Sequence, residues 1–276
     1  MILRTESGPL YFQITGEGPP LVFVSGWAMS SNCWQPAIEA LERKCLCLAY
    51  DQRGIARSQP ANQRARFTIE DHAEDLHQIL ERAGIFDATI IGHETGALVA
   101  AACIRLHPQD ARALVIVSPR ATVTESDVKQ LAVFTPASLA LRELAAYPLI
   151  RNIVARRFSR APQPYRNALF EDFANLDPRA AYETALSASS QESSASLERI
   201  ITRASLPVLL ICGEKDKKGA TEARRLFSLA RAAKLATMRG CGFLPMLEYP
   251  QQFVRLLDRF VSAQATARRS LSRSKP

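Results

Sequence analysis

One acidic residue lies in a glycine-flanked turn between a strand-like and a helical stretch, a position from which a side chain could react with a ligand. Glu94 is at the centre of the run Gly92-His93-Glu94-Thr95-Gly96, which follows an apolar, strand-like stretch and precedes a helical one. The two glycines let a strand and the next helix approach closely around the turn between them. The free N–H groups of a helix N-terminus favour a charged carboxylate there, whereas burial favours its neutral form. Glu94 is therefore a candidate acid, base or nucleophile.

Strand-like apolar runs alternate along the chain with stretches of helical length. The runs cover residues 21–24, 45–50, 88–91, 113–117, 208–212 and 234–238. Helical patterns cover residues 97–106, 251–261 and a segment that ends at Gly84, which opens with Thr68 and Asp71 as a capping pair. This alternation predicts an α/β fold, with a mostly parallel, twisted sheet and helices on both faces.

One long segment breaks the alternation. Residues 121–205 show helical patterns interrupted by prolines and no convincing strand. We expect this segment to form a helical cap over the carboxyl ends of the strands, where open α/β sheets bind ligands. The α/β core then comprises residues 1–120 and 206–263. A basic tail rich in serine and alanine, residues 264–276, has the composition of a disordered segment.

Five segments, in order along nearly the whole chain, resemble the α/β-hydrolase superfamily. Residues 92–96 resemble its nucleophile elbow, and residues 22–27 resemble the strand that carries half of its oxyanion hole. Residues 51–58 are similar to its D-x-R-G-x-G-x-S loop, 211–216 to the strand and loop that carry the acid, and 240–245 to the histidine turn. In detail the chain is similar to the capped esterase group that includes a carrier-protein methyl esterase.

The departures from the family pattern bear on function. The elbow serine is replaced by Glu94, and Phe243 stands at the position of the histidine. Ser25 replaces a histidine near the oxyanion hole, and only Asp216, the acid, is kept. With no histidine to orient, we expect Asp216 to be an exposed loop residue. Phe243 is expected to make the pocket more apolar. Serine hydrolysis by the standard triad is therefore excluded.

None of the four histidines is expected to substitute for the missing one. His93 precedes the elbow residue and is expected to point into supporting structure, while His107 ends a helix as a packing element. His72 and His77 lie on the helix before the elbow strand, which is far from the site in this fold.

Three functions remain open. In the first, Glu94 is a general acid or base on a small apolar metabolite, in lyase, cyclase or isomerase chemistry of secondary metabolism. The resemblance implies that the backbone N–H groups of Trp27 and Thr95 would then stabilise the developing anion. In the second, the chain binds a ligand without catalysis. A residual ester hydrolase is the third, disfavoured because Phe243 cannot activate water as a histidine does. No cofactor or metal is expected.

Composition limits the partners. The formal net charge is +8, but nothing resembles a nucleic-acid-binding module, and no apolar run is long enough to span a membrane. The N-terminus lacks a signal-peptide pattern, and six scattered cysteines suit buried positions in a reducing compartment, so a cytoplasmic location is expected. A basic cluster in the cap is interpreted as a solvated helix face, with an acyl carrier or CoA-linked acyl group as the alternative partner: Arg151, Arg156, Arg157, Arg160 and Arg166.

Overall fold

An eight-stranded sheet organises the chain in the computed structural model, which describes residues 1–59, 61–120, 159–174, 176–203 and 206–273. The strand order is β1-β2-β4-β3-β5-β6-β7-β8, and all neighbours from β4 to β8 are parallel. The strands are β1 (Ile2–Thr5), β2 (Gly8–Thr15), β3 (Pro20–Val24), β4 (Leu46–Tyr50), β5 (Ala88–His93), β6 (Ala111–Val117), β7 (Val208–Gly213) and β8 (Ala233–Met238). The predicted fold class and its six strands are confirmed.

The antiparallel strands β1 and β2 were not predicted. Their signal is weak because β2 buries only Leu10 and Phe12 and opens with Gly8 and Pro9, which are poor strand formers. They pair in register from Ile2 with Tyr11 onward and extend the sheet beyond β4.

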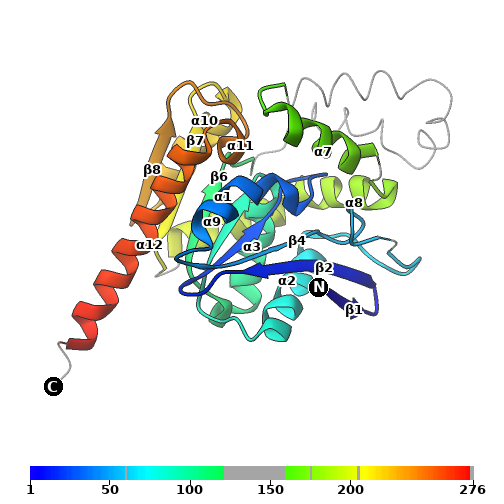
Figure 1. Ribbon diagram of the computed structural model, residues 1–276, viewed down its shortest axis with the longest axis horizontal. Coiled ribbons are helices and arrows are strands. Elements are labelled where there is room, and N and C mark those ends of the chain that lie inside the picture. The colour runs from blue at the N-terminus through cyan, green and yellow to red at the C-terminus, as the bar shows by residue number, and fades with distance from the viewer. Residues whose placement is uncertain (60, 121–158, 175, 204–205, 274–276) are drawn as a thin grey trace.

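Helices cover both faces of the sheet (Figure 1). Alternate residues of β3 separate the two cores, because Leu21 and Phe23 belong to one hydrophobic cluster and Val22 and Val24 to the other. The first face carries α1 (Gln35–Leu41) and α12 (Pro250–Arg273), and the second carries α2 (Ile69–Ala83), α3 (Thr95–Leu106) and α9 (Gln191–Arg203). The other helices are η1 (Ser31–Trp34), η2 (Pro108–Asp110), α7 (Gln163–Ala174), α8 (Pro178–Ala188), α10 (Lys217–Leu229) and α11 (Pro245–Glu248).

The predicted ends of α2 are confirmed. The Thr68 side chain accepts from the Asp71 N–H, and the Asp71 carboxylate accepts in return from the Thr68 N–H, so both orphan donors are satisfied. Gly84 ends the helix in the left-handed conformation, at φ 64°.

The segment between β6 and β7 forms three helices over its described residues. Helix α7 contacts η1 and α8 contacts α2, whereas α9 packs on α3 as part of the core layer. Residues 121–158, less than half of the predicted cap, lie outside the described residues. Figure 1 shows α7 and α8 along one end of the sheet.

A disordered tail is predicted for residues 264–276, and α12 continues through the described part of that stretch to Arg273. Alanine, glutamine and arginine in this stretch are good helix formers, and the helix is already nucleated on the core upstream. Among the described helices, none combines the length and the apolar character that crossing a bilayer requires.

Candidate active site

Glu94 occupies a strained turn between β5 and α3. Its backbone has φ 52° and ψ −115°, a conformation that costs a non-glycine residue about 1–3 kcal/mol. A Cβ on Gly92 would lie 2.5 Å from the Gly96 carbonyl oxygen, and one on Gly96 would lie 2.4 Å from the Val24 carbonyl oxygen. Both glycines are therefore needed for the close approach, as the sequence predicted.

The Glu94 carboxylate is bound by the predicted oxyanion-hole donor. The backbone N–H of Trp27 donates to Oε2 of Glu94 at 3.0 Å. Glu94 as a whole is only 8% exposed. Thr95, which carries the second predicted donor, is the first residue of α3, where N–H groups have no intrahelical acceptor. The Trp27 N–H is therefore bonded to the Glu94 side chain itself.

Ser25 does not face Glu94 as a reacting group. Its hydroxyl donates to the Ser30 carbonyl oxygen at 3.1 Å, and its own carbonyl oxygen accepts from the Gln52 side chain at 2.7 Å. These bonds shape the residues that follow β3. The Ser25 hydroxyl therefore bonds within the turn that carries the Trp27 N–H.

Two side chains crowd the turn at Gly26. A Cβ added to Gly26 would lie 2.6 Å from Nδ1 of His93 and 2.9 Å from Oε2 of Glu94. The His93 ring packs edge-on against Phe243, with centroids 4.6 Å apart. Its Nε2 lies 3.0 Å from the Phe243 carbonyl oxygen, and because a carbonyl only accepts, Nε2 must carry the proton. These contacts fit the supporting role expected of His93.

The expectation that Asp216 is an exposed loop residue is wrong. Asp216 is 7% exposed, and its Oδ1 accepts from Nη2 of Arg120 at 2.7 Å and from the Gly219 N–H at 3.2 Å. It is buried because it caps α10 and pairs with a cation. Over the described residues, its other oxygen, Oδ2, has no hydrogen-bond partner.

Arg120 was missed by the sequence reasoning. It follows β6 by three residues, and its guanidinium lies 5.1 Å from the ring centroid of Phe243. Arg120 thus pairs with Asp216 beside Phe243, the residue that the resemblance places at the histidine position. A charged residue just beyond a buried parallel strand was the available signal.

The remaining histidines are engaged away from Glu94. Nε2 of His72 lies 2.8 Å from the Thr184 hydroxyl, and burial, helped by Arg53, lowers the pKa of His72 to about 3. His77 and His107 stack with ring centroids 3.6 Å apart.

The basic cluster is only partly described. Arg160 donates to the Gly240 carbonyl oxygen at 3.1 Å, and Arg166 donates to the Ser159 carbonyl oxygen at 3.5 Å. The other three arginines lie outside the described residues, so an acyl carrier or CoA partner stays a prediction.

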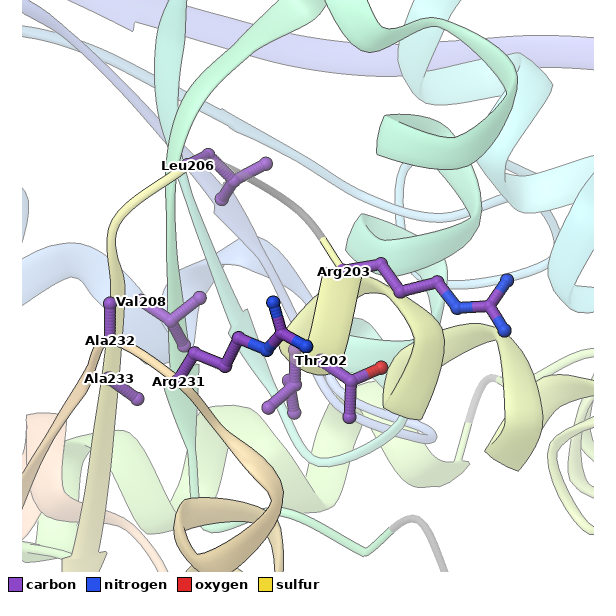
Figure 2. Close-up of a pocket in the computed structure, with 8 residues that line it drawn as sticks. Thr202, Arg203, Leu206, Val208, Arg231, Ala232 and Ala233 are labelled. Atoms are coloured by element: carbon purple, nitrogen blue, oxygen red, sulfur yellow. The ribbon is translucent and has the colours of Figure 1, made fainter.

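A pocket of about 400 Å³ lies beside the amino ends of β7 and β8 (Figure 2). It is lined by the end of α9 and by Val208 and Ala233, the first residues of β7 and β8. Glu94 follows the carboxyl end of a strand parallel to these two. The pocket therefore belongs to a different region from the candidate site.

Comparisons with known proteins agree with this architecture. Residues 19–248 match the family model for the alpha/beta hydrolase fold. A putative carbamate hydrolase RutD from Azorhizobium caulinodans is 31% identical over 109 residues, and one from Escherichia coli O157:H7 is 34% identical over 102 residues. These matches span 40% and 37% of this chain, and 40% and 38% of the relatives.

Solved structures resemble nearly the whole chain. A thermophilic esterase from Thermogutta terrifontis superposes with a TM-score of 0.81 at 19% identity, over 95% of this chain and 98% of that one. An enol-lactonase from Burkholderia xenovorans LB400 gives 0.76 at 18% identity, over 95% and 100%. At these identities the likeness concerns the fold. With the family model matched from residue 19 to residue 248, this chain belongs to the α/β-hydrolase fold family.

Proposed function

We propose that this chain is a cofactor-independent, non-hydrolytic enzyme in which Glu94 transfers a proton to and from a small apolar carbonyl compound. The observation that carries the proposal is the hydrogen bond from the Trp27 N–H to the Glu94 carboxylate. Together with the N-terminus of α3, it makes the turn a place that holds one negative charge.

In the proposed reaction the negative charge moves from the Glu94 carboxylate to the substrate oxygen, and the total charge of the site stays the same. The Glu94 carboxylate removes a proton from the carbon next to a substrate carbonyl, so the C–H bond breaks and an O–H bond forms on Glu94. The electron pair forms a C=C bond, and the carbonyl electrons move onto the substrate oxygen. Because Glu94 is now neutral, the Trp27 N–H is free to bind the new oxyanion together with the Thr95 N–H. Returning the proton from Glu94 to another carbon completes an isomerisation. In an elimination the C=O bond re-forms, a C=C bond forms to the next carbon, and the leaving group departs from that carbon with its bonding electrons and takes the proton from Glu94.

The test is proton exchange in D₂O. Incubation with a panel of apolar ketones, esters and lactones should replace the hydrogens next to the carbonyl by deuterium, measured by ¹H NMR. Glu94→Gln should abolish exchange because the amide cannot accept the proton, while binding of the same compound, measured by saturation-transfer NMR, is retained. Glu183→Gln removes a charge from the partly exposed ion pair with Arg179 on α8 and should exchange as the natural protein does.

Exchange that is equal in the natural protein and in Glu94→Gln would end the proposal. Ester or lactone cleavage that disappears in Glu94→Gln would instead identify a residual hydrolase with Glu94 as nucleophile.

A second candidate is a ligand-binding pseudo-hydrolase, and the same hydrogen bond favours it. A carboxylate that fills the anion site of the fold excludes a substrate oxyanion as long as it stays charged. This candidate predicts binding of panel compounds with no exchange and no cleavage, and equal binding by Glu94→Gln.

We also propose that the protein works in the cytoplasm on a small molecule. Its six cysteines are all buried free thiols, which fits a reducing compartment.

A further inference from the structure

The segment between β6 and β7 is bonded to the turn that presents the Trp27 N–H. We name residues 25–30 the Trp27 loop. The Ser30 N–H donates to Oδ2 of Asp172 on α7 at 3.2 Å, and the Ser30 hydroxyl donates to the same oxygen. The Trp27 indole N–H donates to the Ala181 carbonyl oxygen on α8 at 2.8 Å. Two helices therefore hold the loop from one side.

Asp172 is an unusual residue for this task because it is charged and buried. Asp172 is only 7% exposed. Leu169, one turn earlier on α7, belongs to the hydrophobic cluster on the same face of the sheet as α1. A buried carboxylate is stable only when it is hydrogen-bonded. The two Ser30 donors supply those bonds, so the position of Ser30 and the charge of Asp172 depend on each other.

We propose that Asp172 is a positioning residue that fixes the Trp27 loop and so sets the backbone N–H of Trp27 against the Glu94 carboxylate. Trp27 is three residues before Ser30, within a turn closed by the Met29 N–H to the Gly26 carbonyl oxygen. A displacement of Ser30 therefore moves the donor that meets Glu94. Its effect on turnover rests on the proposed function, but the link between Asp172 and the loop does not.

The charge of Asp172 gives the link a measurable pH dependence. Burial raises the pKa of Asp172 to about 6, against the two Ser30 hydrogen bonds, which lower it. Asp51 and Arg57, from the loop after β4, act in opposite directions, and the Cys33 thiol of η1 is also close enough to interact. Below pH 6 the carboxyl is neutral, and its bonds to Ser30 lose their charge assistance.

The indole signals of the chain make a direct probe, because it contains only two tryptophans. In ¹⁵N-labelled protein the Trp27 indole resonance is identified by its loss in Trp27→Phe. We expect the Trp27 indole and backbone amide to shift in a single step with a midpoint near pH 6. Asp172→Asn should remove the step. Glu171→Gln, which removes one charge from an exposed position on the same helix, should keep it.

A second variant covers the case in which Asp172→Asn does not fold. Ser30→Ala removes the hydroxyl donor to the charged carboxylate, so the midpoint of the Trp27 step should move above that of the natural protein. Asp172→Glu, which keeps the charge, should retain a step. A Trp27 step unchanged in Asp172→Asn, or a midpoint unchanged in Ser30→Ala, overturns the proposal.

The two proposals fail separately. If Glu94→Gln leaves proton exchange intact while Asp172→Asn abolishes the Trp27 step, the proposed function is wrong and the positioning role stands. If Glu94→Gln abolishes exchange while the Trp27 step persists in Asp172→Asn, the reverse holds.

Discussion

At the scale of single residues, the candidate site contains two acids, Glu94 and Asp216, with different partners. Asp216, which the resemblance places at the position of the triad acid, is paired with Arg120, whose guanidinium also lies over the ring of Phe243. Arg120 neutralises the acid that would otherwise orient an imidazole, and Glu94 supplies its own anion to the Trp27 N–H. Placing serine at residue 94 and histidine at residue 243, as the resemblance to the family suggests, should therefore not be enough to produce hydrolysis.

We predict that Glu94→Ser with Phe243→His leaves cleavage of p-nitrophenyl acetate near background. A guanidinium beside the new imidazole opposes formation of the imidazolium that serine attack requires. Adding Arg120→Leu should raise the rate on the order of tenfold or more, within the range of general base catalysis. Arg120→Leu alone is the control and should show no gain. Equal rates in the double and triple variants would contradict this role of Arg120.

At the scale of elements, the sequence predicts those helices and strands whose signals lie within a few neighbouring residues. Six parallel strands and the capped helix α2 follow from apolar runs and from the Thr68 and Asp71 pair, all within a few residues of each other. The strained turn at Glu94 was also expected, from the resemblance of residues 92–96 to the nucleophile elbow.

The bonds that define the site are not local. Trp27 and Glu94 are 67 residues apart, Arg120 and Asp216 are 96 apart, and Ser30 and Asp172 are 142 apart. Each pairing depends on which elements meet at the carboxyl edge of the sheet, which a single sequence does not encode as a pattern. The sequence thus located Glu94 and the Trp27 donor separately, but not the bond that joins them.

The loop after β4 is held to α2 by a buried ion pair. Arg53 donates through Nε and Nη2 to both oxygens of Asp75, and both residues are buried. Asp75→Asn would leave the guanidinium without a countercharge, so we predict a loss of about 3–5 kcal/mol in the free energy of unfolding, measured by urea denaturation. Glu183→Gln breaks the partly exposed pair with Arg179 and should cost less than about 1 kcal/mol. Similar losses of unfolding free energy in Asp75→Asn and Glu183→Gln would show that burial of the ion pair does not determine its contribution to stability.

At the scale of the whole molecule, the segment between β6 and β7 is bound to both hydrophobic cores. Leu169 and Ala181 belong to the cluster on one face of the sheet, and Leu197 and Ile201 belong to the cluster on the other. Because α7, α8 and α9 share the hydrophobic clusters of the sheet, we expect these three helices to unfold together with the sheet rather than separately. A proton bound at Asp172 should then change the stability of the entire fold.

The sign of that change follows from proton linkage. The folded protein holds the Asp172 proton with a pKa of about 6, above the ordinary value of 3.8, so it binds the proton more tightly than the unfolded chain does. The carboxyl therefore lowers the free energy of unfolding as pH rises from about 4 to 6, with burial as the cause. We predict that, between pH 4 and pH 7, the free energy of unfolding of the natural protein falls by about 2 kcal/mol relative to that of Asp172→Asn, measured by urea denaturation at a series of pH values. Other titrating groups are common to both proteins and cancel in the difference. Parallel pH profiles would mean that the charge of Asp172 is not buried when α7 is docked on the Trp27 loop.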